Sequence, residues 1–461
     1  MTIRVAGVPS RAVGAMIERE RKRFVADNPT SCALAERVRR HWFCGVPMHW
    51  MLDWGTPFPL FVRDAAGARF TDVDGHEYVD FCLGDTGAMF GHSPPPIAEV
   101  LAHQGTRGLT VMLPTEDAAV VGEELARRFG LPFWQTATTA TDANRFVLRW
   151  ARGLTGREKI LVFNGCYHGS VDETYVWLEN GRPVHRPGLI GQAVDLTENT
   201  VVVEFNDLEA LERALAGGDI ACVITEPALT NIGMVLPEPG FHEGLRRLTR
   251  QYGTLLVIDE THTISTGFGG YTRTHGLEPD FFVLGKPVAG GVPCAVYGFT
   301  AEVAQRMEQV MSQREPGHTG MGTTLSGNAL AMAAMRVNLQ QVMTEAAYDH
   351  MLALSRKLAD GMAAEIARHG LPWHVSSVGA RAEFVCRPQP PRNGTEAAAA
   401  IHGDLEQAIH LFLLNRGVVI TPFHNMTLVC PQTREEDVER LIAVLGECLD
   451  ELLADGEARG S

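Results

Sequence analysis

The chain has 461 residues, more than one hydrophobic core ordinarily supports, so its length predicts two or three domains. Hydrophobic residues make up 45% of the chain and charged residues 21%, as in water-soluble globular proteins. The net charge is −15 and no basic stripe occurs, which argues against a nucleic-acid partner. Apolar runs are too short to cross a bilayer and the N-terminal residues lack a signal-peptide core, so we expect a cytoplasmic protein with no membrane partner.

The nine cysteines are scattered, and none belongs to a C-x-x-C pair. Most of them lie in apolar stretches, which is typical of buried free thiols. We therefore expect neither a disulfide framework nor a zinc site, and no metal.

Hydrophobic periodicity predicts an amphipathic helix over 12–27 and short strands within 55–82, where Ala-Gly and Asp-Gly turns interrupt alternating residues. From about 96 to 325, short apolar runs alternate with helical segments. The predicted strands are 160–163, 221–225, 255–259, 281–284 and 296–299, and the predicted helices are 116–129, 141–154, 207–216, 239–252 and 301–312. This alternation predicts an α/β fold with a mostly parallel sheet covered by helices.

The C-terminal part of the chain has a different pattern. It is helical from 326 to 368, and then contains strand-like pieces at 382–386, 418–421 and 427–429 and helices near 395–416 and 433–454. We predict three segments. Residues 1–95 supply a helix and strands to a smaller α+β domain, 96–325 form the large domain, and 326–461 complete the small domain.

Lys286 is one of only four lysines, and the other three lie in polar segments. It directly follows the apolar run FFVLG, and ligands gather at the carboxyl ends of strands in sheets of this type. A lysine among apolar neighbours is a candidate nucleophilic amine. The alternative is a lysine whose ammonium group extends to solvent.

Asp259 ends another apolar run, LLVID, 27 residues before Lys286, an interval that suits one crossover between neighbouring strands. A buried aspartate needs a cationic partner, which a protonated pyridine nitrogen would supply, although an aspartate there could simply cap the next loop. Thr139, Ala140 and Thr141 open a helix whose free N–H groups suit a phosphate. The alternative for this segment is an ordinary Thr/Asp helix cap.

Together these pieces resemble the class-III, fold-type-I enzymes that use pyridoxal 5′-phosphate (PLP), which include omega-aminotransferases, β-amino-acid aminotransferases and glutamate-1-semialdehyde aminomutase. The resemblance covers about residues 55–450. Its ordered motifs are Asp72-Val-Asp74-Gly75-His-Glu-Tyr78-Val-Asp80, Gly91-His92-Ser93-Pro94, Tyr167-His168-Gly169, Glu226-Pro227, Asp259-Glu260 with Gly267-Phe268, Lys286, and Thr324-Leu-Ser-Gly-Asn328. Each motif is weak alone, but the ordered set is highly specific.

The resemblance implies that the large domain binds PLP. Lys286 would be the Schiff-base lysine, Asp259 the partner of the ring nitrogen, and Tyr167 the aromatic ring that stacks on the cofactor. Glu226 also falls at a cofactor-binding position, and Thr324 would reach the phosphate of the neighbouring subunit. A homodimer with active sites at the interface is therefore implied.

Two segments depart from the family pattern. Ala140 stands where the phosphate loop usually has glycine, and Thr261 and His262 follow the Asp-Glu pair where Val and Gln or Met are more usual. Thr261 would lie against the ring face, and His262 would lie near the ring's 3-oxygen. The alternative for His262 is an imidazole packed behind the site, from which it could still tune the cofactor.

The sequence does not determine which substrate the protein binds. Relatives that act on β-amino acids bind a carboxylate through an arginine in a C-terminal loop, but the matching residues 421–425 lack one. Arg381 is a candidate replacement, and the alternative is a salt bridge from Arg381 to Glu383 or another acid.

The pocket candidates also suit different kinds of substrate. Trp50 and Phe423 suit an aromatic or bulky apolar amine, whereas Asp85 suits a second cationic group. The full set of candidates is His49, Trp50, Asp85, Thr86, Arg381 and His424.

The resemblance implies a PLP-dependent aminotransferase that moves an amino group between an amine or amino acid and a keto acid, aldehyde or ketone. An aminomutase, epimerase or decarboxylase would use the same Lys286 and Asp259. A catalytically silent binding protein on this fold would be expected to lose one of these two residues. A nicotinamide-dependent oxidoreductase would need G-x-G-x-x-G after the first strand of a βαβ unit, and none is so placed.

Overall fold

The computed structural model describes residues 3–457, and contacts divide them into two units. Unit 2 consists of Pro95–Tyr348 and Pro391–Ala399, and the rest of the chain forms unit 1. Residues 326–348, which the sequence analysis assigned to the C-terminal domain, lie in unit 2 because α10 (Ala329–Val337) packs on α3 (Pro95–Gln104) and α4 (Asp117–Phe129). Within residues 3–457, no helix is long and apolar enough to cross a membrane.

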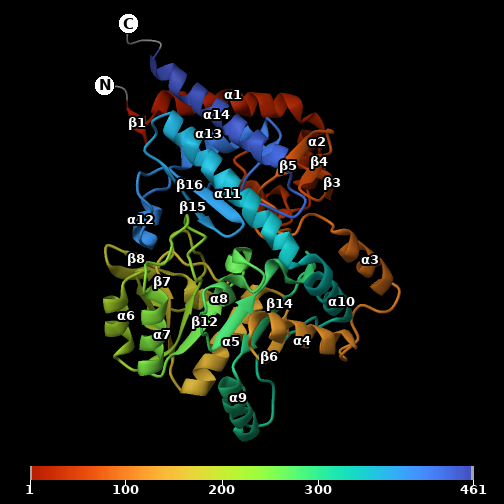
Figure 1. The fold of residues 1–461 in the computed structure, drawn as a ribbon, viewed down its shortest axis with the longest axis vertical. Helices are drawn as coiled ribbons and strands as arrows, with labels where there is room; N and C mark the ends of the chain where they lie inside the picture. Colours follow the sequence, from red (N-terminus) through yellow and green to blue (C-terminus); the bar gives the residue numbers. More distant parts are fainter. Residues whose placement is uncertain (1–2, 458–461) are drawn as a thin grey trace. The chain divides into compact units, whose positions relative to one another are not determined.

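A seven-stranded sheet forms the centre of unit 2 (Figure 1). Neighbouring strands are parallel except around β14, which is antiparallel to both of its neighbours. The strand order is β10 (Thr200–Val203), β7 (Lys159–Phe163), β11 (Ile220–Thr225), β12 (Leu255–Asp259), β13 (Phe281–Leu284), β14 (Ala295–Phe299) and β6 (Phe133–Ala137). The predicted α/β architecture with a mostly parallel sheet is confirmed.

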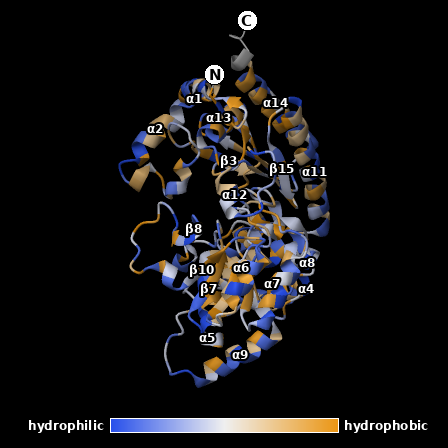
Figure 2. Cartoon of the chain, turned by 90° about the vertical axis from the view of Figure 1, so that its left-hand side faces the viewer, coloured by the Kyte–Doolittle hydropathy of each residue, from blue (hydrophilic) through white to orange (hydrophobic). Residues whose placement is uncertain are grey.

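Helices cover both faces of this sheet, so its inner strands are buried on both sides. Side chains alternate between the faces: Val257 packs with α5 (Ala140–Thr155) and α9 (Ala301–Gln313), whereas Ile258 packs with α6 (Leu208–Leu215) and α7 (Phe241–Gln251). Every residue of β11 to β14 is buried, and the part of the sheet near the β7 and β10 labels in Figure 2 is drawn largely in orange. Two-sided burial explains why the sequence shows continuous apolar runs there.

Glu260 explains one of the sequence motifs structurally. Its buried carboxylate accepts hydrogen bonds from the hydroxyl of Thr263 (2.6 Å) and from the backbone N–H groups of Tyr271 (3.0 Å) and Thr272. These two N–H groups belong to the first turn of α8 (Gly270–Thr274). Glu260 therefore holds the segment that follows β12 against α8, which fixes the direction in which the chain leaves Asp259.

Unit 1 contains two small sheets and a layer of helices. One sheet has the order β17 (Val418–Val419), β5 (Glu77–Asp80), β4 (Arg69–Asp72) and β3 (Val62–Ala66), and the other has β15 (His374–Val378), β16 (Arg381–Val385) and β18 (Met426–Leu428). A two-stranded ribbon is formed by β1 (Arg4–Val5) and β2 (Val8–Pro9). The helices are α1 (Ser10–Asp27), α2 (Pro29–Val38), α13 (Gly403–Leu414), α14 (Glu435–Glu457) and most of α11 (Glu345–Arg368).

The single helix predicted over 395–416 is wrong. The structure has α12 (Gly394–Ala398) in unit 2 and α13 in unit 1, separated by residues 399–402. The start of α12 is fixed by close packing, since a Cβ at Gly394 would lie 2.0 Å from the carbonyl oxygen of Asn164. The two helices thus pack in different units, which local periodicity does not reveal.

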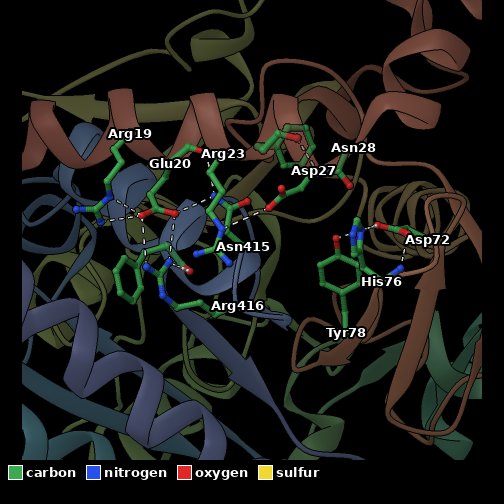
Figure 3. Close-up of polar contacts among 12 residues, drawn as sticks. Arg19, Glu20, Arg23, Asp27, Asn28, Asp72, His76, Tyr78, Asn415 and Arg416 are labelled. Atoms are coloured by element: carbon green, nitrogen blue, oxygen red, sulfur yellow. Dashed lines mark hydrogen bonds and ion pairs between the residues drawn. The ribbon is translucent and has the colours of Figure 1, made fainter.

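Buried polar contacts tie the N-terminal segments into unit 1 (Figure 3). Glu20 of α1 accepts hydrogen bonds from Asn415 (2.9 Å) and Arg416 (3.2 Å), which directly follow α13. Asp72, in the N-terminal hairpin motif, accepts a hydrogen bond from the Tyr78 hydroxyl at 2.9 Å. Both carboxylates are buried, so the contacts hold the helix and the hairpin in place.

Candidate active site

Asp259 and Lys286 lie at the same edge of the large sheet. Their strands, β12 and β13, are parallel neighbours, with Asp259 opposite Val283. The backbone N–H of Glu260 donates to the Val283 carbonyl at 2.8 Å, so the pairing continues to the end of β12. Lys286 follows two residues after the last residue of β13. This is the edge where parallel sheets bind ligands.

The Asp259 carboxylate is buried and held by three donors. One oxygen accepts hydrogen bonds from Nδ1 of His168 and Nδ2 of Asn144, each at 2.9 Å, and the other accepts from the Thr261 N–H at 3.1 Å. Burial by itself would raise the pKa of Asp259, but these donors lower it from 3.8 to about 2. Burial would likewise lower the pKa of His168, but the bond to Asp259 raises it to about 10. The site therefore holds an ionised carboxylate beside an imidazolium.

Lys286 meets a second basic group. Its Nζ lies 2.7 Å from Nε2 of His262, a buried residue two positions after Glu260. At this distance one nitrogen donates a hydrogen and the other accepts it. The two side chains can therefore pass a proton between them, a contact that sequence reasoning did not anticipate when it placed His262 near the ring's 3-oxygen.

The backbone at Lys286 has a strained conformation, which hydrogen bonds from a neighbouring side chain stabilise. Its φ of +43° lies in the left-handed region, which costs a non-glycine residue roughly 1–3 kcal/mol. The short helix that starts here, η6 (Lys286–Ala289), is held by the buried Asn338, whose amide donates to the carbonyls of Pro287 (2.7 Å) and Val288 (2.9 Å). The support holds the backbone of the turn from which the Lys286 side chain extends.

The start of α5 forms a cradle next to Lys286. A Cβ at Gly285 would lie 2.7 Å from the Cβ of Ala140, and one at Gly169 would lie 2.2 Å from Oγ1 of Thr141. The Thr141 hydroxyl accepts from the Ser170 N–H at 3.1 Å, and Thr139 caps the helix by accepting from the Asp142 N–H at 3.2 Å. The ordinary helix cap weighed in the sequence analysis is therefore present, at a helix start suited to an anion.

Two other predicted cofactor-binding residues of unit 2, Glu226 and Thr324, lie on different segments. Glu226 follows β11 directly and is buried, which raises its pKa; its carboxylate accepts from the Thr230 hydroxyl. Thr324 lies on an exposed loop, and the adjacent Thr323 contacts the Thr138 hydroxyl at 2.9 Å, beside the loop that leads into α5. The loop therefore lies near the helix start within one chain.

These residues fit PLP by their chemistry. A protonated ring nitrogen needs an anionic partner that stays ionised, and Asp259 is one. The aldehyde needs an amine, which Lys286 provides, and the phosphate needs a helix start that is free of bulk, where a Cβ at Gly285 would intrude. Thr261 lies between these parts, and its hydroxyl accepts from the Gly285 N–H at 3.3 Å.

The substrate-pocket candidates all lie in unit 1. Arg381 of β16 is fully buried; it donates to the Thr86 hydroxyl at 2.8 Å and contacts the sulfur of Met426 at 3.0 Å. Glu383, the acid that the sequence analysis weighed as its partner, contacts Nδ1 of His424 at 2.8 Å. Burial would lower the pKa of His424, but Glu383 raises it.

Strained backbone and exposed aromatic residues complete this group. Asp85 and Thr86 have φ of 49° and 83°, in a loop whose start is fixed by Asp80, which accepts from the N–H groups of residues 82 and 83 at 2.8 Å each. His49 and Trp50 lie in the short helix η2 (His49–Leu52). The Trp50 ring lies 6.0 Å from that of Phe423, edge to face.

Sequence reasoning missed the residues that support the site. Asn144 lies near the start of the amphipathic α5, and Asn338 directly follows α10; nothing local marks either as a ligand of a distant carboxylate or carbonyl. His168 carried a signal, because it belongs to the quoted aromatic-His-Gly motif. Nothing in the sequence indicated that its ring would bond to Asp259.

Comparisons with known proteins agree with this geometry. The class-III aminotransferase family model matches residues 51–449. The glutamate-1-semialdehyde 2,1-aminomutase 2 of Exiguobacterium sibiricum is 34% identical over 401 residues, which are 86% of this chain and 90% of that protein.

Solved structures extend the similarity. A glutamate-1-semialdehyde aminomutase from Pseudomonas aeruginosa PAO1 is 54% identical with a TM-score of 0.95, covering 97% of this chain and all of that one, and its K286A variant was solved with PMP. An omega-transaminase from Sphaerobacter thermophilus is 28% identical with a TM-score of 0.83, covering 93% of this chain and 99% of that one. The fold is therefore that of the fold-type-I PLP enzymes, and the cofactor is PLP.

Proposed function

Because this chain belongs to the class-III aminotransferase family, we propose that it is a PLP-dependent aminomutase, an enzyme that exchanges amino and carbonyl groups between neighbouring carbons. The support is the similarity to glutamate-1-semialdehyde 2,1-aminomutases, at 34% identity over most of the chain and at 54% to the Pseudomonas aeruginosa structure. The proposed substrate is an amino aldehyde with a carboxylate. For glutamate 1-semialdehyde, or 4-amino-5-oxopentanoate, the product would be its isomer 5-amino-4-oxopentanoate.

The observation that carries the PLP chemistry, which both candidate reactions share, is that an ionised Asp259 and a Lys286 amine in contact with His262 lie at the same edge of the sheet. Bound PLP supplies an electron sink that makes a carbon–hydrogen bond next to the amino group acidic. Lys286 would hold PLP and, once released by an incoming amine, would remove and return the proton at that carbon. His262 would accept and return a proton at Nζ of Lys286, and Asp259 would keep the ring nitrogen protonated.

Tyr167 and Thr261 would flank the ring, and the start of α5, from Thr139 to Thr141, would hold the phosphate. We also propose a homodimer, as the family resemblance implies, in which Thr324 reaches the partner's phosphate. The support within one chain is its exposed loop position.

Transfer between two different molecules is the second candidate, the one that the sequence analysis preferred. It is supported by the family itself and by the 28% identity to the omega-transaminase. The two candidates differ in their balance of atoms. An aminomutase converts one isomer to another and needs no second carbonyl compound, whereas an aminotransferase consumes a keto acid and forms an amino acid in equal amount.

The test is a time course of 4-amino-5-oxopentanoate with the PLP-loaded enzyme, with and without pyruvate. We expect one 5-amino-4-oxopentanoate for each substrate consumed, at the same rate in both samples and with no alanine. Product that depends on pyruvate, together with stoichiometric alanine, would instead establish the aminotransferase.

A further inference from the structure

Arg186 is surrounded by aromatic rings beside the expected cofactor site. It follows the hairpin of β8 (Val176–Glu179) and β9 (Arg182–His185), and it is half-buried. Its guanidinium carbon lies 5.2 Å from the ring centroid of Trp177, 5.6 Å from that of Tyr167 and 5.9 Å from that of Tyr175. Its backbone N–H donates to the Tyr175 carbonyl at 2.9 Å, which anchors the residue. All four residues belong to unit 2.

In the part of the chain that the structure describes, the guanidinium group of Arg186 contacts the three rings but has no hydrogen-bond acceptor. Within residues 3–457, no hydrogen bond or ion pair joins it to another side chain or to a carbonyl. The guanidinium groups of two other interior arginines of unit 2 do have acceptors: Arg246 forms two bonds of 2.8 Å to Asp280, and Arg128 donates to the carbonyl of Met343 at 2.8 Å. Arg186 is therefore a cation whose in-plane N–H donors are available to a ligand.

The chemistry of such a group selects a carboxylate. Aromatic rings attract the flat faces of a guanidinium ion. The N–H groups of the ion point outward in its plane and stay available as donors. A planar, bidentate anion matches that arrangement, and partial burial strengthens the bond relative to bulk water. The rings also limit the conformations of the arginine side chain, so less entropy is lost when a ligand binds.

The position connects Arg186 to the reacting groups. Tyr167, one of the three rings, directly precedes His168, which bonds to Asp259. We infer that Arg186 binds the carboxylate of the substrate and so selects amino compounds that carry one. This inference rests on the proposed function, since it assigns the substrate carboxylate to a residue of unit 2. Arg381, the candidate from the sequence, is fully buried and already donates to Thr86.

The experiment compares two amines of equal length, 4-aminobutyrate and butylamine, which differ by a carboxylate in place of a methyl group. Each is titrated into the PLP-loaded enzyme, and the dissociation constant is read from the absorbance of bound PLP. We expect the wild type to prefer 4-aminobutyrate. In Arg186→Met its affinity should fall about 10- to 100-fold, because a bond to a charged group is lost, while that of butylamine should change less than about threefold.

Two further variants, Arg186→Lys and Arg381→Met, are titrated with the same two amines for comparison. Lysine keeps the charge but not the fork of donors, so we expect an intermediate loss for 4-aminobutyrate alone. Equal losses for both amines in Arg186→Met would mean that Arg186 only supports Tyr167, and would overturn the inference. Equal affinities of the wild type for both amines, or a carboxylate preference lost in Arg381→Met and kept in Arg186→Met, would also overturn it. These titrations do not depend on turnover, so they are separate from the product assay that tests the aminomutase.

Discussion

At the scale of single residues, hydrogen bonds from neighbouring side chains hold the charged groups of the site in position. Asp259 stays ionised although it is buried, because His168 and Asn144 donate to it. Lys286 is fixed by a strained backbone that Asn338 supports and by contact with His262. Catalysis by proton transfer requires such fixed donors and acceptors, since a small displacement is enough to lose much of the rate.

The pair of His168 and Asp259 predicts a pH-dependent contribution to stability. The pKa of Asp259 is lowered to about 2, so its contribution is complete above pH 3.8 and is lost as the pH falls towards 2. The pKa of His168 is raised to about 10, so its contribution is complete below pH 6.5 and is lost as the pH rises towards 10. The full contribution, on the order of 2 kcal/mol, is therefore present between about pH 4 and 6.5.

His168→Gln removes this contribution while keeping a neutral donor. The melting temperature of the PLP-free variant should lie a few degrees below that of the wild type at pH 5.5, and the gap should narrow at pH 9.5. Differential scanning fluorimetry at the two pH values measures it. A gap of constant size would show that the bond carries no charge contribution.

The contact between His262 and Lys286 predicts a catalytic effect. His262→Phe should lower the rate of the proton transfer about 100-fold or more, because Lys286 loses its proton partner, while PLP still binds. Stopped-flow absorbance after mixing with an amine measures the rate, and the visible spectrum before mixing serves as the control. A variant that binds PLP and reacts at the wild-type rate would assign His262 a packing role only.

At the scale of elements, a side chain distant in sequence determines where α2 begins. Pro29 opens the helix, and Asp74 in the turn after β4 accepts from the N–H groups of Thr30 (2.7 Å) and Ser31 (2.9 Å). The hairpin motif noted in the sequence therefore has a structural task, capping a neighbouring helix. An anionic group at this end also interacts favourably with the helix dipole.

Removing that cap should destabilise unit 1 locally. Asp74→Ala should cost about 1 kcal/mol, whereas Asp64→Ala, an exposed residue on β3 that contacts its neighbour Arg63, should cost almost nothing. Hydrogen exchange of the Thr30 and Ser31 amides measures the effect directly. Equal exchange in both variants would refute the assigned cap.

Much of the large sheet could be predicted because two-sided burial leaves continuous apolar runs, as in β11 to β13. The edge strands β6 and β10 were missed because they are less completely buried: only the last residue of β6 is buried, and one residue of the four-residue β10 is half-buried. The same holds for the site. Asp259 and Lys286 are marked by local strand-end positions, whereas Asn144 reaches Asp259 across 115 residues and the rings around Arg186 meet only in three dimensions.

At the scale of the whole molecule, exposed apolar residues favour the proposed homodimer. Leu109, Val111, Met112 and Leu113 form an exposed run in unit 2, and Leu325, next to Thr324, is 52% exposed. Soluble monomers rarely leave contiguous patches of this kind uncovered. A second copy of the chain would cover them and bring Thr324 to the partner's phosphate.

Charge placed in this run should weaken the dimer. Met112→Glu should shift the protein towards the monomer, whereas Met311→Glu, on the exposed side of α9, should not. Size-exclusion chromatography with light scattering, run with PLP present, measures the mass. A wild-type monomer, or a dimer unaffected by Met112→Glu, would contradict this interface.

The proposed chemistry depends on Lys286, the residue that we expect to hold PLP. The most direct test is the visible spectrum of the purified protein after incubation with PLP and removal of the excess. We predict a band at roughly 410–430 nm that disappears when an amine is added, and that is absent in Lys286→Ala although this variant still folds. A colourless wild-type protein, or an unchanged band in Lys286→Ala, would show that Lys286 does not hold PLP.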